Sequence, residues 1–407
     1  MFLKKKKAES QKNSPLQADT MSQCCHPSSG AAPGCGAQGS EIYNDVKDYY
    51  GKYLKKSEDL KTNACVTSTK PQPKFIRDAL KDVHEDVVSR YYGCGLVVPE
   101  CLENCRILDL GSGSGRDCYM LSKLVGEKGH VTGIDMTDEQ VEIAHKHIEY
   151  HMKKFGFKQP NVDFVHGYIE KLGDAGIQDK SYDIVISNCV INLSPDKRAV
   201  LGEAYRVLKD GGEVYFSDVY ANLEMSDEIR KHKVLWGECL GGALWWKDLF
   251  IIAEEVGFYP PRLVTASEIT VNNENLEQVV GDYKFVSATF RLFKVPRSVK
   301  QNKKYQVVYN GGITGSEAEL QFDINFTFQE GEVVDVDEDT YNILKNSRFA
   351  QDFLMRPVTG EVTSKSGGCC RAEAKEIMID PFKLLQQLKT KNTTSNAANC
   401  SGLGGCC

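Results

Sequence analysis

The sequence predicts an α/β protein built on a parallel sheet that helices cover on both faces. Between residues 106 and about 220, short apolar runs typical of strands alternate with stretches whose apolar residues recur at helical spacing. Strands that alternate with helices in this way form parallel sheets, because a helix makes each return crossing. The expected strands cover residues 106–110, 130–134, 162–165, 182–187 and 213–217, and the expected helices cover 119–125, 138–155 and 197–209.

The length of 407 residues leaves room for more than one domain, because a single core seldom grows past about 250 residues. Low apolar content predicts a disordered tail at one end and a flexible Cys-rich tail at the other. The expected units are the disordered tail 1–40, a helical segment 41–105 that carries Cys65 and Cys94, a nucleoside-binding core 106–220, a segment 221–295 that completes the sheet, a small α/β domain 305–363 and the Cys-rich tail 364–407.

Charge and hydropathy exclude several classes of partner. A formal net charge of -6 argues against binding to nucleic acid or to an anionic membrane, since both reward a basic face. No apolar run approaches the roughly 20 residues of a membrane span, and the N-terminus lacks the apolar core of a secretory signal. We therefore expect a cytosolic protein, in which fifteen cysteines point to metal binding, redox chemistry or packing rather than to structural disulfides.

A glycine-rich turn follows the first expected strand and is the strongest single motif. Gly111, Gly113 and Gly115 would let a ligand approach bare backbone at the start of a helix. A dinucleotide motif would place glycine three residues after Gly113, where Arg116 stands. Asp109, directly before the turn, suits an amino group better than a pyrophosphate.

Asp135 ends the next strand, where a carboxylate can accept hydrogen bonds from both ribose hydroxyls. Taken singly, Asp109 could be an ordinary loop carboxylate and Asp135 a helix cap. Together with the glycine turn, the two acids indicate a site for a neutral or cationic nucleoside.

These motifs resemble the seven-stranded, Rossmann-like S-adenosylmethionine methyltransferases, with Ser187 and Asn188 ending the fourth strand as a further match. The resemblance implies an inserted substrate-binding segment beside the cofactor core. It also implies that residues from Gly111 to Gly115 pack on the methionine moiety and that Asn188 lies near the methionine end. The cofactor-binding set that it implies is Asp109, Gly111, Gly113, Ser114, Gly115, Asp135, Met136, Gly167, Ile169, Glu170 and Asn188, with Asp135 and Met136 framing ribose and adenine and the residues 167–170 edging the adenine.

Four cysteines lie outside the expected tails in unusual settings: Cys65, Cys94, Cys189 and Cys239. Cys189 follows the fourth strand, at the sheet edge where open α/β sheets present catalytic residues. A thiolate there is a poor base but a good ligand for soft, thiophilic atoms. Trivalent arsenic on three sulfurs keeps a lone pair that could attack a sulfonium methyl group without any proton transfer, so no catalytic histidine is needed.

The contexts of these cysteines resemble the arsenite methyltransferase family, over residues 41–295 and more weakly through the C-terminal unit. The resemblance implies methyl transfer to arsenite and then to methylarsenite, for arsenic metabolism and detoxification, with 221–295 as the arsenic-binding segment. It assigns arsenic to Cys189 and Cys239, with Cys94 as the third ligand. Cys65 and Cys94 would form a thiol pair that oxidises and that thioredoxin or glutathione restores. We further expect a monomer.

Several alternatives stay open on the residues alone. Each cysteine could be a small buried side chain, which is the usual role of free cysteine. Zinc sites normally use paired ligands, and these four are well separated. Cys101 and Cys105 have helical spacing, and His145 and His151 suggest a solvated helix face. The chain could also methylate a quinone, phenol or sterol, or be a thiol-rich metal-binding or redox-sensing protein without turnover.

Overall fold

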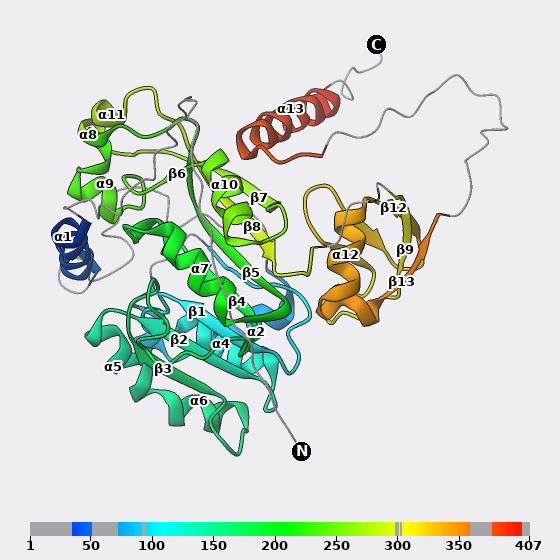
Figure 1. The fold of residues 1–407 in the computed structure, drawn as a ribbon, viewed down its shortest axis with the longest axis horizontal. Helices are drawn as coiled ribbons and strands as arrows, with labels where there is room; N and C mark the ends of the chain where they lie inside the picture. The colour runs from blue at the N-terminus through cyan, green and yellow to red at the C-terminus, as the bar shows by residue number, and fades with distance from the viewer. Residues whose placement is uncertain are drawn as a thin grey trace, which may run out of the picture.

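The computed structural model describes residues 35–50, 72–91, 95–297, 301, 303–358 and 377–400, with backbone alone at 35–40 and 391–400. Cys65 and Cys94, which the sequence assigns to the site, lie outside these ranges. So do the paired cysteines of the expected C-terminal tail. In Figure 1 the main sheet runs through the middle of the molecule, and a smaller C-terminal unit lies to one side of it.

The main sheet has seven strands in one path, ordered β3-β2-β1-β4-β5-β8-β7, and a short eighth strand that pairs with β5. All neighbours up to β5 pair in parallel, whereas β8 runs antiparallel to β5 and to β7. The predicted α/β methyltransferase-like fold class is therefore confirmed. The strands are β1 (Arg106–Leu110), β2 (His130–Asp135), β3 (Val162–His166), β4 (Tyr182–Asn188), β5 (Leu208–Ala221), β6 (Leu244–Trp245), β7 (Arg262–Ile269) and β8 (Phe285–Phe293).

Alternate residues of the strands feed two apolar cores on opposite faces of the sheet. Ile107 belongs to the core beneath the helices that follow β1 and β2, and Leu108 belongs to the core beneath the helices that follow β4 and β6. Both residues are fully buried, which is why β1 is apolar along most of its length. The helices concerned are α4 (Arg116–Val125), α5 (Asp138–Lys146), α6 (Ile148–Phe155), α7 (Lys197–Val207) and α10 (Trp246–Val256).

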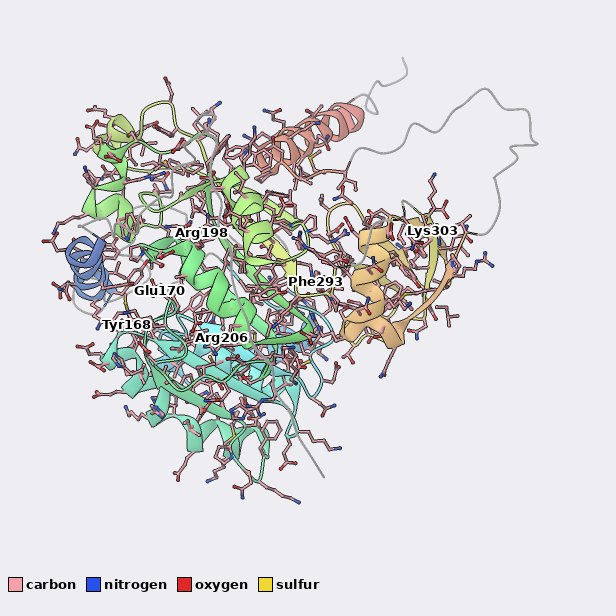
Figure 2. The ribbon with its side chains drawn as sticks, viewed as in Figure 1. Tyr168, Glu170, Arg198, Arg206, Phe293 and Lys303 are labelled. Carbon is pink, nitrogen blue, oxygen red and sulfur yellow. The ribbon has the colours of Figure 1, made fainter. Side chains whose placement is uncertain are left out.

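The C-terminal unit contains a three-stranded antiparallel sheet, ordered β12-β9-β13, and a helix. Its core includes Tyr259 and Phe293 of the main domain, so the two units share one continuous cluster of buried side chains. Phe293 lies where the two meet (Figure 2). The elements are β9 (Tyr305–Tyr309), β10 (Glu319–Gln321), β11 (Thr327–Gln329), β12 (Val333–Val336), α12 (Glu338–Asn346), η4 (Arg348–Asp352) and β13 (Phe353–Pro357).

The last helix, α13 (Pro381–Cys400), lies within the segment expected to be a flexible tail. Leu384 is buried in the core that spans β7 and β8, and Lys389 pairs with Glu268 of β7 at 2.7 Å. These residues of the expected flexible tail are therefore helical and packed against the sheet. An apolar face formed by Leu384 and Leu385 anchors the helix against the sheet.

Several predicted helix boundaries differ from the structure. The remaining helices are α1 (Cys35–Asp48), α2 (Lys74–Lys81), α3 (Glu85–Val88), η3 (Ile191–Leu193), α8 (Asp227–Arg230), α9 (Lys233–Gly237) and α11 (Glu274–Val280). Helix α1 begins at Cys35, inside the expected disordered tail. Cys101 and Cys105 are not helical as their spacing suggested, because Cys101 has a positive φ of 55°. Among the described residues, no helix has the length and apolarity needed to cross a bilayer.

The predicted helix 138–155 is divided at His147 into α5 and α6, and His151 lies on the buried face of the second. His151 is fully buried and stacks on Tyr119 with 3.5 Å between ring centroids. Burial lowers the pKa of His151 to about 4. The assignment of His151 to a solvated face was therefore wrong, whereas His145 is exposed as expected.

Candidate active site

The glycine turn connects β1 to α4 and leaves one backbone position open. Gly111, Gly113 and Gly115 all have positive φ, which glycine adopts without strain. A side chain at Gly111 would collide with Val190 at 2.5 Å, and one at Gly115 would collide with the Phe164 ring at 2.6 Å. A Cβ atom added to Gly113 would have no other atom within 4 Å, so a ligand can approach the backbone there.

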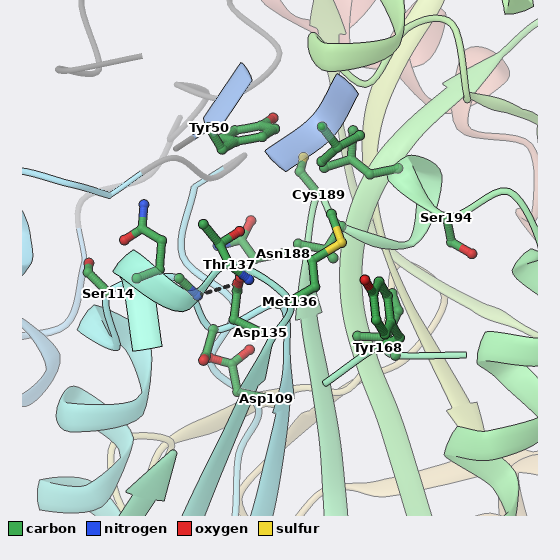
Figure 3. Close-up of a pocket in the computed structure, with 18 of the residues that line it drawn as sticks. Tyr50, Asp109, Ser114, Asp135, Met136, Thr137, Tyr168, Asn188, Cys189 and Ser194 are labelled. Carbon is green, nitrogen blue, oxygen red and sulfur yellow. Dashed lines mark hydrogen bonds between the residues drawn. The ribbon is translucent and has the colours of Figure 1, made fainter. Parts of the chain in front are cut away.

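Asp135, at the end of β2, ties the glycine turn to the next loop. Its carboxylate accepts hydrogen bonds from the backbone N–H of Gly113 at 2.9 Å and of Thr137 at 2.8 Å (Figure 3). Thr137 is the N-cap residue of α5, although its side chain makes no cap hydrogen bond. Burial raises the pKa of the Asp135 carboxyl group, although the two backbone bonds oppose this shift.

Asp109 and Asp117 add two more acidic groups to the same cavity. Asp109 is 3% exposed and accepts a hydrogen bond from the thiol of Cys118 at 3.2 Å. Burial is the larger cause and the negative charge of Asp117 the next, and together they raise the pKa of Asp109 to about 8. A cationic ligand would offset this repulsion and favour the carboxylate form, so the cavity suits a sulfonium or ammonium group.

The cavity collects ten of the eleven predicted cofactor residues together with Cys189. Gly115 does not line it and instead packs beneath Phe164. Figure 3 shows the acidic residues Asp109 and Asp135 on one side of the cavity and Cys189 on the other. The predicted residues that line it are Asp109, Gly111, Gly113, Ser114, Asp135, Met136, Gly167, Ile169, Glu170 and Asn188.

Helix α1 covers the cavity, which the sequence analysis did not anticipate. Tyr43 and Val46 of α1 line the cavity, as does Tyr50 just after the helix ends. Tyr43 packs on Tyr168 with 4.9 Å between ring centroids, and the Tyr50 hydroxyl donates to the carbonyl of Gly237 at 2.8 Å. Apolar and aromatic residues at helical spacing were visible in the sequence, but nothing in it indicated which surface they would cover.

The thiol of Cys239 lies against the backbone of Cys189, which lines the cavity. The Cys239 thiol donates to the Cys189 carbonyl oxygen at 3.1 Å, and both residues belong to one buried cluster. Both have positive φ, 57° for Cys189 and 62° for Cys239, a conformation that costs free energy for residues other than glycine. Such strained positions concentrate at functional sites, where the surrounding structure holds them in place.

Cys189 is disulfide-bonded, whereas Cys101, Cys105, Cys118 and Cys239 are not. The cysteine bonded to Cys189 is therefore none of these four. In this form the Cys189 sulfur cannot act as a thiolate ligand until the bond is reduced.

A buried polar cluster fastens the loop after Cys189 to β5, and the same loop touches the segment that carries Cys239. Asp218 accepts hydrogen bonds from the backbone N–H of Asn192 at 3.0 Å and from its side-chain amide at 2.7 Å. A side chain on Gly242 would lie 1.9 Å from the Asn192 carbonyl oxygen, so the two segments touch at the backbone. This contact leaves no room for a side chain, which explains why position 242 is a glycine.

Asn188 forms hydrogen bonds with Tyr91 and Gly95, the residues on either side of positions 92–94, which lie outside the described ranges. Its side-chain amide donates to the Tyr91 hydroxyl at 2.7 Å and to the Gly95 carbonyl at 3.0 Å. The same amide lies 3.2 Å from Asp117, beside the glycine turn. Asn188 thus connects the cofactor end of the cavity to the chain on both sides of Cys94.

The part of the chain that the structure describes contains no group of three or more His, Cys, Asp or Glu side chains that could hold a metal ion. The described cysteines Cys101, Cys105 and Cys118 do not line the cavity. Cys105 donates to the carbonyl of Cys101 at 3.3 Å, and Cys118 bonds to Asp109.

Comparison with known proteins identifies the family. Human arsenite methyltransferase is 64% identical over 370 residues, which cover 90% of this chain and 97% of the human protein. The chain belongs to the arsenite methyltransferase family. Residues 102–257 match a methyltransferase domain, and residues 302–407 match the arsenite methyltransferase C-terminal domain.

More distant members of the family agree with this assignment. Arsenite methyltransferase of Aquipseudomonas alcaligenes is 48% identical and covers 77% of this chain and 90% of its own length. The crystal structure of an arsenic(III) S-adenosylmethionine methyltransferase from Chlamydomonas reinhardtii is similar, with a TM-score of 0.68 and 44% identity. That match covers 70% of this chain and 97% of the algal chain.

Proposed function

We propose that this protein transfers methyl groups from S-adenosylmethionine to trivalent arsenic, first to arsenite and then to methylarsenite, in arsenic metabolism and detoxification. The main support is the position of Cys189, which lines the same cavity as the glycine turn and Asp135 and lies against Cys239. Membership of the arsenite methyltransferase family supports the same activity.

The residues of the cavity fit S-adenosylmethionine, which when bound supplies an electrophilic sulfonium methyl group. The open side of Gly113 gives room for close contact with backbone, and Asp109 and Asp117 provide the negative field that a cation requires. Asp135 and Met136 would frame ribose and adenine, with Ile169 at the adenine edge. The set that we propose is the eleven cofactor residues predicted from the sequence.

Arsenic would bind as a thiolate complex of Cys94, Cys189 and Cys239. Arsenite exchanges its three hydroxyl groups for three sulfurs, and the remaining lone pair attacks the methyl carbon. The methylated arsenic has then formally lost two electrons. Cys65 and Cys94 would return them by forming a disulfide, which is why these residues belong to the proposed catalytic set.

An external thiol would complete each cycle. The disulfide at Cys189 supports this requirement, since a bonded sulfur has no thiolate to offer. We propose thioredoxin or glutathione as the reductant. A reducing compartment would keep these thiols available, which supports a cytosolic location, and we propose that the protein acts as a monomer without nucleic-acid or membrane partners.

The test is an assay of purified protein with methyl-labelled donor, arsenite and a thiol, in which labelled mono- and dimethylated arsenicals should form. Cys189→Ser and Cys239→Ser should abolish turnover on both arsenicals. Cys105→Ser is the matched control, because Cys105 is also a buried free thiol but does not line the cavity.

Two results would contradict the proposal. If arsenic is not labelled and a quinone, phenol or sterol is, the protein methylates an organic acceptor. If arsenite binds but no donor is consumed, the protein is a thiol-rich binding or redox protein.

A further inference from the structure

Helix α1 contacts both the donor cavity and the segment that carries Cys239. Tyr43 and Val46 line the cavity, and Val46 also belongs to the apolar cluster that contains Cys189 and Cys239. Figure 1 shows α1 beside α9, and an ion pair of 2.9 Å joins the two helices. One helix thus lies against the residues proposed for the methyl donor and against those proposed for arsenic.

At the donor end, α1 is attached to the loop that follows β3. The Tyr43 ring packs on the Tyr168 ring with 4.9 Å between centroids, and the ammonium group of Lys47 donates to the Tyr168 hydroxyl at 3.1 Å. Tyr168 lines the cavity and lies within the stretch 167–170, which we propose as the edge of the adenine site. The adenine of a bound donor would therefore lie against the loop that holds α1.

At the acceptor end, two tyrosines directly after α1 hold the end of α9. The Tyr49 hydroxyl donates to the carboxylate of Glu238 at 2.6 Å, and the Tyr50 hydroxyl donates to the carbonyl of Gly237 at 2.8 Å. The Tyr49 ring also packs closely on Gly237, where an added Cβ atom would lie 2.9 Å from the ring. Glu238 is fully buried, and burial of a carboxylate is costly unless a donor bonds to it. These bonds fix the two residues that precede Cys239.

Cys239 depends on such support because its own backbone conformation is unfavourable. Its φ of 62° lies in the left-handed region, which costs free energy for a residue with a side chain. Its thiol nevertheless lies 3.1 Å from the Cys189 carbonyl oxygen. Fixing the preceding residue, Glu238, limits how far Cys239 can relax towards a more favourable conformation.

We propose that α1 couples donor binding to arsenite binding, with Tyr49 as a positioning residue that acts on Cys239 through Glu238. This inference rests on the proposed function. A donor that packs against Tyr168 stabilises the docked position of α1, and the docked helix holds Cys239 in place for arsenic. Coupling free energies are reciprocal, so arsenite should strengthen donor binding by the same factor.

Arsenite titrations with and without S-adenosylhomocysteine measure this coupling. The analogue has the adenosine group but no methyl group to transfer, so binding is separated from turnover. For the reduced, unchanged protein we expect the analogue to lower the Kd of arsenite about fivefold or more, followed by the ultraviolet absorption of arsenic–thiolate bonds.

Tyr49→Phe keeps the ring on Gly237 and removes only the hydroxyl that binds Glu238. The coupling factor should fall below about twofold in this variant, because a hydrogen bond to a charged group is lost. The affinity for the analogue alone should stay nearly the same, since Tyr43 still packs on Tyr168. A general loss of stability would lower both affinities instead.

Tyr259→Phe is the matched control. Tyr259 is a buried tyrosine whose hydroxyl donates to the carbonyl of Pro296 at 3.4 Å, and it packs in the core of the C-terminal unit rather than at the cavity. This variant should keep the full coupling factor. Glu238→Gln tests the partner of Tyr49. Its amide oxygen still accepts from the Tyr49 hydroxyl, so it should keep more of the coupling than Tyr49→Phe does.

A measurement on the unchanged protein covers the case in which the variants do not fold. S-adenosylhomocysteine alone should slow hydrogen exchange at the amides of Glu238 and Cys239, which bond to carbonyls of α9. Neither residue lines the cavity, so this protection would arise through α1 rather than by contact with the ligand.

Four outcomes would overturn the inference. They are an arsenite Kd that the analogue does not change, a full coupling factor in Tyr49→Phe, an equal loss of coupling in Tyr259→Phe, and unaltered exchange at Glu238 and Cys239. If the unchanged protein binds the analogue but forms no labelled arsenical from the donor, the proposed function itself fails. A protein that methylates arsenite without coupling refutes this inference alone.

Discussion

The sulfur of Cys239 lies 3.1 Å from the carbonyl oxygen of Cys189, although the two residues are fifty positions apart in the chain. Both have left-handed backbone conformations, so neither loop would adopt this geometry alone. The contact between Asn192 and Gly242 holds the loops together at the backbone. The relative position of Cys189 and Cys239 should therefore depend on Gly242, which has no side chain.

Gly242→Ala should separate the two cysteine loops. A methyl group there would lie 1.9 Å from the Asn192 carbonyl oxygen, so the backbone must move. We expect the free energy of unfolding to fall by roughly 1–3 kcal/mol and arsenite turnover to fall further than donor affinity does. Denaturant unfolding and donor titration measure the two effects separately.

Gly202→Ala is the control for this change. Gly202 lies in α7 with nothing within 4 Å of the added methyl group, so the variant should be about 0.5–1 kcal/mol more stable because alanine favours helix. Normal turnover in Gly242→Ala would show that the contact does not set the acceptor geometry.

Cys65→Ser should change the preference between the two arsenicals. Without Cys65 the proposed thiol pair cannot return the two electrons lost in the first methylation. Methylarsenite enters with its arsenic already trivalent and bound by Cys189 and Cys239, and water can displace its dimethylated product from the two thiolates in the pentavalent state, with no electrons returned. Methylarsenite should therefore become the better substrate, in contrast to Cys189→Ser, which should lose both activities. Rates for each arsenical at saturating donor check this. Equal losses on both would remove Cys65 from the redox role.

The part of the site that sequence could predict is the part made by consecutive residues. The bounds predicted for β1, the glycine turn and Asp135 follow from strand periodicity and from the conformations that only glycine adopts easily. Cys189 was placed at the sheet edge because it directly follows a strand. All of these are local signals.

The contacts that sequence could not predict join segments far apart in the chain. Nothing near Tyr50 indicates that its hydroxyl binds Gly237, and nothing near Arg348 indicates that it binds Glu100. His151 was misassigned because it was grouped with the exposed His145, six positions earlier, whereas it continues the buried face of Ala144 and His147. Such errors arise where packing, rather than local preference, decides the outcome.

Asp135→Asn should weaken donor binding. The asparagine keeps one acceptor oxygen, so it cannot accept from both Gly113 and Thr137, and it offers no charge to the ribose hydroxyls. Hydrogen bonds to charged groups contribute about 1.5–3 kcal/mol, which predicts a loss of donor affinity of roughly tenfold or more in calorimetric titration. Asp138→Asn is the control, because that side chain is 74% exposed three residues away. Similar losses in both variants would mean that only the local charge matters.

The stability of the ligand-free protein should fall as pH rises through the neutral range. The pKa of Asp109 is about 8 in the folded state and near 3.8 when unfolded, so the folded state binds more protons across that interval. Stability from a raised carboxyl pKa is lost as pH increases towards the folded value. Asp218, whose pKa burial raises to about 7, contributes in the same direction. His151, with its pKa lowered to about 4, opposes the trend only below the usual histidine range.

The Asp109→Asn variant isolates the contribution of this one carboxyl group. An asparagine can still accept from the Cys118 thiol but does not titrate, so denaturant unfolding between about pH 6.5 and about pH 8 should show a smaller loss of stability than in the unchanged protein. Added S-adenosylmethionine should flatten the profile of the unchanged protein as well, because a bound cation lowers the folded pKa of Asp109. An identical pH slope in the variant would show that Asp109 is already ionised in the empty site. The cation would then owe its binding to the remaining acidic groups.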